Sequence, residues 1–210
     1  MKIHTMEQYS DDWWAIRKGL PTASVASKII SPTGKFSTQS RALVNELIAD
    51  SLGLGDPPIE QTEWMLRGTE LEPEARKYFE YETGLPSVEV GFITNDEGTA
   101  GASPDGLIPF AKDLNQYRAG LEIKCPKPST HIGYRLAFLK DGSMPAYYKP
   151  QVHWSMAVSG LKQWHFLSYH PDLEPVHVVA EWDAYTDAIA GAIVKFAESM
   201  KAARETLGLD

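Results

Sequence analysis

Two short stretches of the chain decide its fold, residues 102–107 (ASPDGL) and residues 121–126 (LEIKCP). Both contain short apolar runs bounded by turn-forming residues, which is the pattern of neighbouring β-strands. Glu122 and Lys124 are two residues apart, so in a strand their side chains project from the same face of the sheet. Because lysine and glutamate are seldom buried unless they are paired, this arrangement indicates either an ion pair or a functional site.

Asp105 adds a second carboxylate beside this pair. It lies between Pro104 and Gly106, which favour a turn and let a ligand approach the backbone. Two carboxylates that converge repel each other unless a cation lies between them. Oxygen ligands suit Mg²⁺ or Mn²⁺, and a neighbouring lysine can orient water or stabilise charge on phosphorus. The alternative is a cross-strand salt bridge or a solvated sheet face.

Helical and strand patterns alternate on both sides of these stretches. The longest helical patterns cover residues 64–83, with Gly84 as a stop, and residues 183–207, capped by Asp183 and ended by Gly208. Shorter helices are expected after Thr22, from Ser37 or Thr38 to Gly53, and at residues 130–139 and 146–159. Strands are expected at residues 88–94, 100–102, 106–109, 119–124, 163–169 and 176–181. The order of elements predicts an α/β or α+β protein, with residues 1–210 forming one domain.

The composition narrows the class of protein further. The 210 residues include 20 Lys and Arg and 28 Asp and Glu, which gives a formal net charge of −8. This balance argues against a protein that binds nucleic acid over its whole surface. We expect no membrane segment and no secretory signal, because no apolar run reaches the roughly 18 residues that a membrane helix needs. A single cysteine, Cys125, excludes an intramolecular disulfide and favours a cytoplasmic protein.

Five sequence blocks, in order along residues 13–160, resemble those of the lambda-type phage exonucleases, the YqaJ-like viral recombinase family of the PD-(D/E)xK nuclease superfamily. The blocks are WWAIRKG with TAS (13–24), GTELEPEAR (68–76), ASPDGL (102–107), LEIKCP (121–126) and YKPQVHWSM (148–156). The two central blocks alone consist of common residues, whereas the ordered set is specific. The resemblance implies an α/β fold with a restriction-endonuclease-like core, in which helices flank a central mixed β-sheet.

The resemblance also implies roles at a metal site. Asp105 and Glu122 match the carboxylates that bind the metal, and the carbonyl of Ile123 matches a further ligand. Lys124 matches the catalytic lysine. Glu72 matches a helical glutamate that faces the site and assists a metal ion or its waters. The family has one more acid upstream of Asp105, and its register here falls near Asn95, Asp96 and Glu97 without selecting one of them.

Further matches concern the later helix and a pocket for the 5′-phosphate of a DNA end. Tyr148 and Gln151 match active-site residues, and Arg17, Thr22 and Ser24 match the phosphate pocket. Arg17 offers a planar fork that fits phosphate oxygens, and hydroxyls at a helix start add donors. In the alternative interpretation Thr22 only caps a helix and Arg17 is a surface charge.

The expected function is therefore a Mg²⁺-dependent exodeoxyribonuclease that digests one strand of linear duplex DNA from the 5′ end, with Mn²⁺ able to replace Mg²⁺. No phosphate-binding loop motif is present, so ATP is not expected to be needed. The resemblance further implies a processive homotrimer that works with a single-strand annealing protein, encoded by a phage or prophage in a bacterial host. The rival functions are a PD-(D/E)xK endonuclease or junction resolvase, and a catalytically silent module that binds DNA ends.

Several other residues have simpler interpretations. Trp64, Met65 and Leu66 could press against DNA, but core packing is the preferred expectation. Cys125 is expected to be a small buried filler and not a nucleophile. The other tryptophans are candidates for the core or for a subunit interface, namely Trp13, Trp14, Trp154, Trp164 and Trp182.

Overall fold

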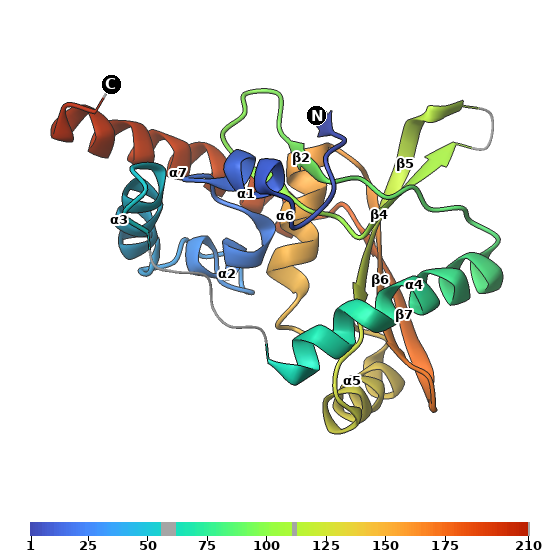
Figure 1. The fold of residues 1–210 in the computed structure, drawn as a ribbon. Coiled ribbons are helices and arrows are strands. Elements are labelled where there is room, and N and C mark those ends of the chain that lie inside the picture. Colours follow the sequence, from blue (N-terminus) through green and yellow to red (C-terminus); the bar gives the residue numbers. More distant parts are fainter. Residues whose placement is uncertain (56–61, 111–112, 210) are drawn as a thin grey trace.

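A computed structural model describes residues 1–55, 62–110 and 113–209 of the chain. A four-stranded mixed sheet lies at the centre (Figure 1), in the order β4 (Gly106–Phe110), β5 (Asp113–Lys124), β6 (Gln163–His170) and β7 (Leu173–Glu181). β5 and β6 are parallel, and the other neighbouring pairs are antiparallel. A smaller antiparallel sheet consists of β1 (Lys2–His4), β2 (Phe92–Thr94) and β3 (Gly101–Ala102).

Helices lie on both faces of the larger sheet (Figure 1). They are α1 (Asp11–Arg17), α2 (Ala26–Ile29), α3 (Ser40–Ser51), α4 (Glu63–Thr83), α5 (Pro128–Asp141), α6 (Lys149–Ser159) and α7 (Ala184–Leu207), and a 3₁₀ turn, η1 (Ala23–Val25), precedes α2. α4 crosses one face, whereas α6 packs against the other face and against α7. This mixed sheet between helices confirms the expected α/β architecture.

The alternation of side chains along β5 assigns them to the two faces of the sheet. Leu121 and Ile123 pack with Phe79 of α4 in an apolar cluster. Period 2 therefore turns Glu122 and Lys124 toward the face that α6 covers. The larger apolar core lies on that side and includes Leu107, Phe166, Trp154, Ile189 and Phe196. Each large side chain buried there contributes about 1.5–3 kcal/mol to the free energy of unfolding.

The two longest helices have the ends that the sequence predicts. α4 starts after Thr62, whose hydroxyl accepts a hydrogen bond from the N–H of Met65 at 3.3 Å, and it ends at Gly84. α7 starts after Asp183, whose carboxylate accepts hydrogen bonds from the N–H groups of Tyr185 and Thr186 at 3.0 Å. These caps satisfy N–H groups that have no partner within the helix.

Other boundaries differ from the expectation. Only Phe92–Thr94 of the expected strand 88–94 is a strand, because Val88 makes an isolated bridge to Leu107 instead. α3 begins at Ser40 after Gln39, so neither Ser37 nor Thr38 caps it. α5 begins two residues earlier than expected, at Pro128, since proline is tolerated in the first turn of a helix. α6 begins three residues later than expected, at Lys149.

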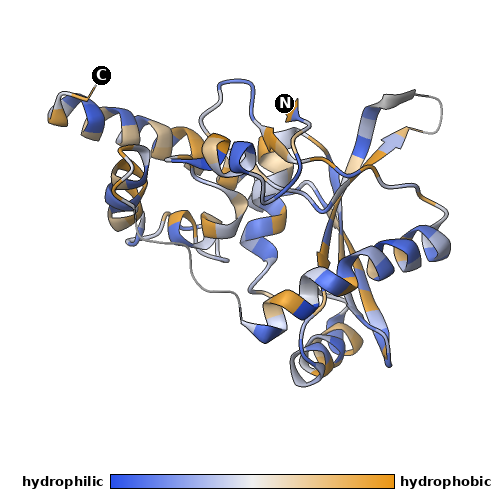
Figure 2. Ribbon diagram, viewed as in Figure 1, coloured by the Kyte–Doolittle hydropathy of each residue, from blue (hydrophilic) through white to orange (hydrophobic). Residues whose placement is uncertain are grey.

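The expectation that Trp64, Met65 and Leu66 belong to the core is wrong. Their exposed fractions are 48%, 51% and 48%. The buried residues of α4 all lie in its second half, and near its start a short orange, hydrophobic segment in Figure 2 follows a hydrophilic first residue. Trp14 is also exposed. Cys125 is buried as expected, and burial raises the pKa of its thiol to about 12.

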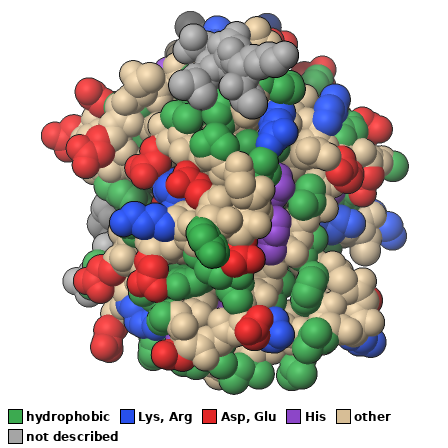
Figure 3. Space-filling model, turned by 90° about the vertical axis from the view of Figure 1, so that its right-hand side faces the viewer, with side chains coloured by type: hydrophobic (Ala, Val, Ile, Leu, Met, Phe, Trp, Pro, Cys, Tyr) green, Lys and Arg blue, Asp and Glu red, His purple; other side chains and the backbone are tan. Residues whose placement is uncertain are grey.

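The surface mixes charges of both signs. On the face that Figure 3 shows, Lys and Arg side chains alternate with Asp and Glu side chains, and neither sign forms a large continuous area there. Within the part of the chain that is described, no helix has the length and apolar character needed to cross a membrane.

Gly120 gives a test of how closely β5 and β6 pack. A Cβ atom at Gly120 would overlap the ring of Trp164, which is fully buried. We predict that Gly120→Ala lowers the free energy of unfolding by about 1–3 kcal/mol, because a packed core cannot absorb the added methyl group. Gly191→Ala is the matched control, since a Cβ atom there meets open space on α7 and should stabilise the helix slightly. Urea unfolding of both variants measures the difference, and equal stability would contradict the packing.

Candidate active site

Asp105 is held at the point where β4 begins beside the end of β5. Its N–H donates a hydrogen bond to the carbonyl of Leu121 at 3.1 Å. Its carboxylate accepts the N–H of Ile123 through Oδ2 at 2.6 Å. The Asp105 carboxylate thus accepts the Ile123 N–H, which the backbone of a longer β4 would otherwise bind. The carboxylate is therefore fixed next to the last residues of β5.

Glu122, Lys124 and Gln151 converge at the same end of β5. Glu122 is only 2% exposed, and its Oε1 accepts hydrogen bonds from Lys124 Nζ and from Gln151 Nε2, the latter at 2.5 Å. Gln151 comes from the first turn of α6, which Tyr148 precedes as the N-cap residue. The ring centroid of Tyr148 lies 5.6 Å from Lys124 Nζ. The structure thus brings together four residues that the sequence selected.

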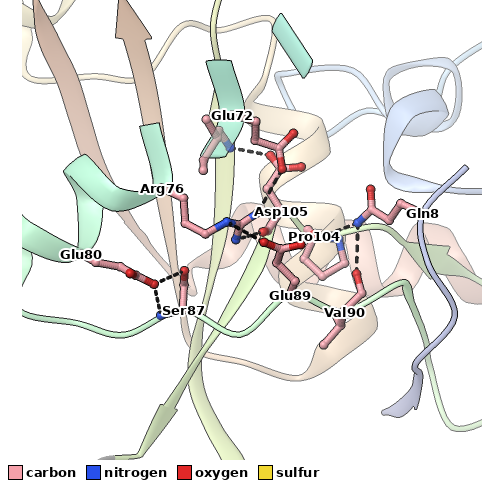
Figure 4. A network of polar contacts seen from close by, with 10 residues as sticks. Gln8, Glu72, Arg76, Glu80, Ser87, Glu89, Val90, Pro104 and Asp105 are labelled. Atoms are coloured by element: carbon pink, nitrogen blue, oxygen red, sulfur yellow. Dashed lines mark hydrogen bonds and ion pairs between the residues drawn. The ribbon is translucent and has the colours of Figure 1, made fainter. Parts of the chain in front are cut away.

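Glu72 reaches the site from α4. Its Oε1 accepts a hydrogen bond from Arg76 Nη2 at 3.0 Å, and Arg76 also donates to the carbonyl oxygen of Asp105 (Figure 4). Glu89 pairs with the Nε of the same arginine at 3.3 Å. Glu72, Arg76, Glu89 and Asp105 line one cavity of about 360 Å³. Arg76 and Glu89 were missed by the sequence reasoning. Arg76 could have been found from its i,i+4 spacing to Glu72, whereas nothing in the sequence places Glu89 here.

The carboxylates of the site share an excess of negative charge. Burial raises the pKa of Glu122 to about 7, and the charge of Asp105 adds to the rise while Lys124 opposes it. Burial also raises the pKa of Glu72 to about 7, again with help from Asp105. The pKa of Asp105 is raised by burial against the effects of Lys124 and the Ile123 N–H. Burial alone would lower the pKa of Lys124, but Glu122 and Asp105 outweigh it and raise that pKa.

The donor set fits a hard divalent cation. Within the described residues no hydrogen bond reaches Asp105 Oδ1 or Glu122 Oε2, so each carboxylate keeps one oxygen for a ligand. The described residues contain no group of three acidic, His or Cys side chains arranged to hold a metal by themselves. Phosphate and water oxygens would have to complete the coordination, as is usual for Mg²⁺.

Arg17 lies beside the segment that leads to Asp105. Its Nη1 donates a hydrogen bond to Ser103 Oγ at 2.9 Å, and its guanidinium lies 4.1 Å from the ring centroid of Trp13. No carboxylate among the residues described forms an ion pair with it. Burial lowers the pKa of Arg17 to about 10, which still leaves it cationic at neutral pH. Ser103 was missed as a pocket residue, although it lies within the motif ASPDGL.

Thr22 and Ser24 approach the same segment. Thr22 is buried and forms a bridge with Gly101, two residues before Ser103. Its hydroxyl lies 3.0 Å from that of Ser24 and makes no capping hydrogen bond to the short 3₁₀ turn, so the interpretation of Thr22 as a helix cap is wrong. Arg17 and Thr22 therefore contact one short stretch of chain, 101–103, and Ser24 adjoins it through the Thr22 hydroxyl.

The residues near the expected upstream acid have structural partners. Asn95 closes its own loop, because its Oδ1 accepts the N–H groups of Thr99 and Ala100 at 2.8 and 3.1 Å. Asp96 forms an ion pair with the N-terminal amine at 2.8 Å. Glu97 is exposed.

A mixed sheet with Asp105, Glu122 and Lys124 at one strand end defines the PD-(D/E)xK class of nucleases. The chain belongs to the YqaJ-like viral recombinase family, whose domain model matches residues 12–162. This confirms the resemblance found in the sequence. No curated protein matches the chain.

Solved structures agree with this assignment. An alkaline exonuclease from Laribacter hongkongensis is 31% identical, with a TM-score of 0.77 over 95% of this chain and 96% of that chain. The structure of that enzyme in complex with dAMP gives 27% identity and a TM-score of 0.72 over 95% and 98% of the two chains. A phage-related exonuclease from Haemophilus somnus shares the fold at 16% identity, with a TM-score of 0.58 over 87% and 95%.

The raised pKa values give a prediction for the effect of Mg²⁺ on stability. A carboxylate whose pKa is raised on folding destabilises the fold as it ionises, so stability should fall as the pH rises toward about 7. Mg²⁺ should reverse this loss by binding the ionised form. We predict that Mg²⁺ raises the midpoint of thermal unfolding more at about pH 8 than at about pH 5. Equal stabilisation at the two pH values would contradict the site.

Proposed function

We propose that the protein is a Mg²⁺-dependent exodeoxyribonuclease that digests one strand of linear duplex DNA in the 5′-to-3′ direction and leaves 3′ single-stranded overhangs. The observation that carries this proposal is the position of Arg17 against Ser103, two residues before Asp105. Arg17, which suits a terminal phosphate, thus lies near Asp105, which suits phosphate hydrolysis. Family membership and the 31% identity to an alkaline exonuclease support a DNA exonuclease.

The residues at the end of β5 would act on the scissile phosphate. Asp105, Glu122 and the carbonyl of Ile123 would hold Mg²⁺, which when bound polarises the phosphate and lowers the pKa of a coordinated water. Gln151 fixes Glu122 by its hydrogen bond. Lys124, partly exposed beside Glu122, is placed to contact a phosphate oxygen or the attacking water.

Glu72 and Tyr148 would support this chemistry from two helices. Glu72 borders the cavity with Asp105 and would assist the metal ion or its waters. Tyr148 packs beside the Lys124 ammonium and limits its movement. Both are proposed as active-site residues.

The proposed direction of digestion depends on the pocket at Arg17. A partly buried guanidinium with a hydroxyl and an aromatic ring as neighbours, and with no carboxylate partner among the described residues, has its charge available for an anion. A terminal phosphate presents pairs of oxygens that such a planar fork can bind through two parallel hydrogen bonds. The hydroxyls of Thr22 and Ser24 would add further donors.

The exposed start of α4 suits the junction between duplex and single strand. Trp64, Met65 and Leu66 expose apolar side chains, and Leu66 precedes Glu72 by six residues, about 9 Å along a helix. Apolar side chains at this distance from the site could lie against the last base pair as the strands part. The preference for DNA contact over core packing at these residues follows from their exposure.

The remaining proposals rest on the family. We propose a homotrimer that encloses DNA and is processive, does not need ATP, and passes its overhangs to a single-strand annealing protein. Mn²⁺ should replace Mg²⁺, because both accept oxygen ligands. Its place of action would be the cytoplasm of a bacterial host, as the product of a phage or prophage.

Substitutions at the end of β5 test the catalytic assignment. Lys124→Ala and Asp105→Ala should each slow digestion of linear duplex in Mg²⁺ by about a thousandfold, because each removes a charge that acts on the transition state. Lys201→Ala, an exposed lysine on α7, is the matched control. Near wild-type rates in either site variant, with thermal unfolding unchanged, would remove the assignment.

The same assay separates the proposed function from its rivals. Linear duplex labelled separately at each end, together with closed circular DNA, reports activity and polarity. Release of label from 5′ ends with circular DNA intact supports the exonuclease. Cutting of circular DNA supports an endonuclease or resolvase, and binding to ends without cutting supports a silent module.

Substitution of Arg17 tests the phosphate pocket. Arg17→Ala should remove most of the preference for 5′-phosphorylated over 5′-hydroxyl ends, because the bidentate contact to phosphate is lost. Arg41→Ala removes an exposed arginine on α3 and serves as the control. An unchanged ratio of rates on the two kinds of end would contradict the pocket.

A further inference from the structure

Tyr9 adopts a backbone conformation that tyrosine rarely takes. Its φ is 68°, and among the described residues it is the one position with positive φ that is not glycine. The left-handed region is unfavourable for a side chain with a Cβ atom, which approaches the following carbonyl. Such outliers persist where the surrounding structure fixes them, and they gather at functional sites.

Contacts on both sides fix the turn that contains Tyr9. Gln8 donates its side-chain amide to the carbonyls of Val90 at 3.0 Å and Pro104 at 3.1 Å (Figure 4). A Cβ atom at Gly91 would overlap the carbonyl of Met6, so glycine is needed for the close approach of these two segments of the chain. The turn is thus tied directly to the residue that precedes Asp105.

The ring of Tyr9 packs against Trp13 and is half-exposed. Its centroid lies 5.0 Å from that of Trp13, whose indole in turn lies 4.1 Å from the Arg17 guanidinium. The tyrosine is 54% exposed and borders the cavity that Glu72 and Asp105 also line. Burial, and then the charges of Asp105 and Glu72, raise the pKa of Tyr9.

We propose that the exposed face of the Tyr9 ring is a stacking platform for the nucleobase at the DNA end. This inference rests on the proposed function and adds a base subsite to it. A nucleotide held by its phosphate at Arg17 and attacked beside Asp105 has its base within reach of a ring that adjoins both groups. Every base has a π face, so the platform accepts any sequence, as an exonuclease requires.

Because the backbone of Tyr9 is in the left-handed region, its ring can be removed without destabilising the fold. Glycine and asparagine tolerate the left-handed region, so Tyr9→Gly and Tyr9→Asn remove the ring without adding backbone strain. Their thermal unfolding midpoints should equal or exceed that of the wild type. Both should bind a short 5′-phosphorylated duplex about tenfold more weakly in the absence of divalent cations, as loss of one stacked base predicts.

The contact itself can be mapped by photocrosslinking. A duplex that carries 5-iododeoxyuridine as its 5′-terminal nucleotide should crosslink to Tyr9, and fragmentation mass spectrometry locates the attachment. Tyr9→Phe keeps the ring and should weaken binding no more than about twofold. Tyr81→Ala, which removes an 85% exposed tyrosine on α4, is the control.

The outcomes separate this inference from the proposed function. Unchanged affinity in the variants without a ring, or a crosslink to another residue, overturns the platform. Affinity as weak in Tyr9→Phe as in Tyr9→Gly shows that the hydroxyl, not the ring, makes the contact, and this also overturns it. Because these assays need no cleavage, they stand apart from a failure of the wild-type enzyme to digest DNA.

Discussion

The negative charge of Asp105 and Glu122, held together at the end of β5, is the constraint on which the rest of the site depends. Burial raises the pKa of both carboxyl groups, and the charge of Asp105 makes Glu122 still harder to ionise. Lys124 offsets one charge, and Arg76 offsets that of the nearby Glu72. Glu89, which pairs with the same arginine, makes four carboxylates against two cations, and this local excess favours a divalent cation. The fold tolerates this arrangement because Ile123 and Gln151 supply hydrogen bonds to the carboxylates.

Backbone contacts between distant segments give the site its shape. Gln8 binds the N-terminal turn to Pro104, directly before Asp105. α1 follows this turn and places Arg17 against Ser103. α4 is bound to the same segment through Arg76. Asp105 therefore lies where three separate parts of the chain meet. The proposed contacts to a terminal phosphate, a scissile phosphate and a base all fall within this small region because of that convergence.

The sequence predicted those parts whose signals are local. Period 2 placed Glu122 and Lys124 on one face, and capping residues placed the C-terminal end of α4 and both ends of α7, because both effects act within a few residues. Glu89 and Gln8 could not be predicted, since their partners lie far away in the chain. The exposure of Trp64, Met65 and Leu66 was mispredicted for a related reason: apolar character does not show where a helix leaves its sheet. The family resemblance selected Glu72 among several acids, and spacing alone could not.

The two cations of the site differ in how their charge is already used. Lys124 is paired with Glu122. Its full charge would therefore act on a phosphate only when another cation neutralises the Glu122 carboxylate. Arg17 has only a hydroxyl and aromatic rings around it in the described structure, so an anion meets its charge at once. In the proposed function, a DNA end would therefore bind before the divalent cation and without it. In the proposed function, a protein with a net charge of −8 would gain from this order, because its affinity for DNA would be concentrated at one pocket and not spread over its surface.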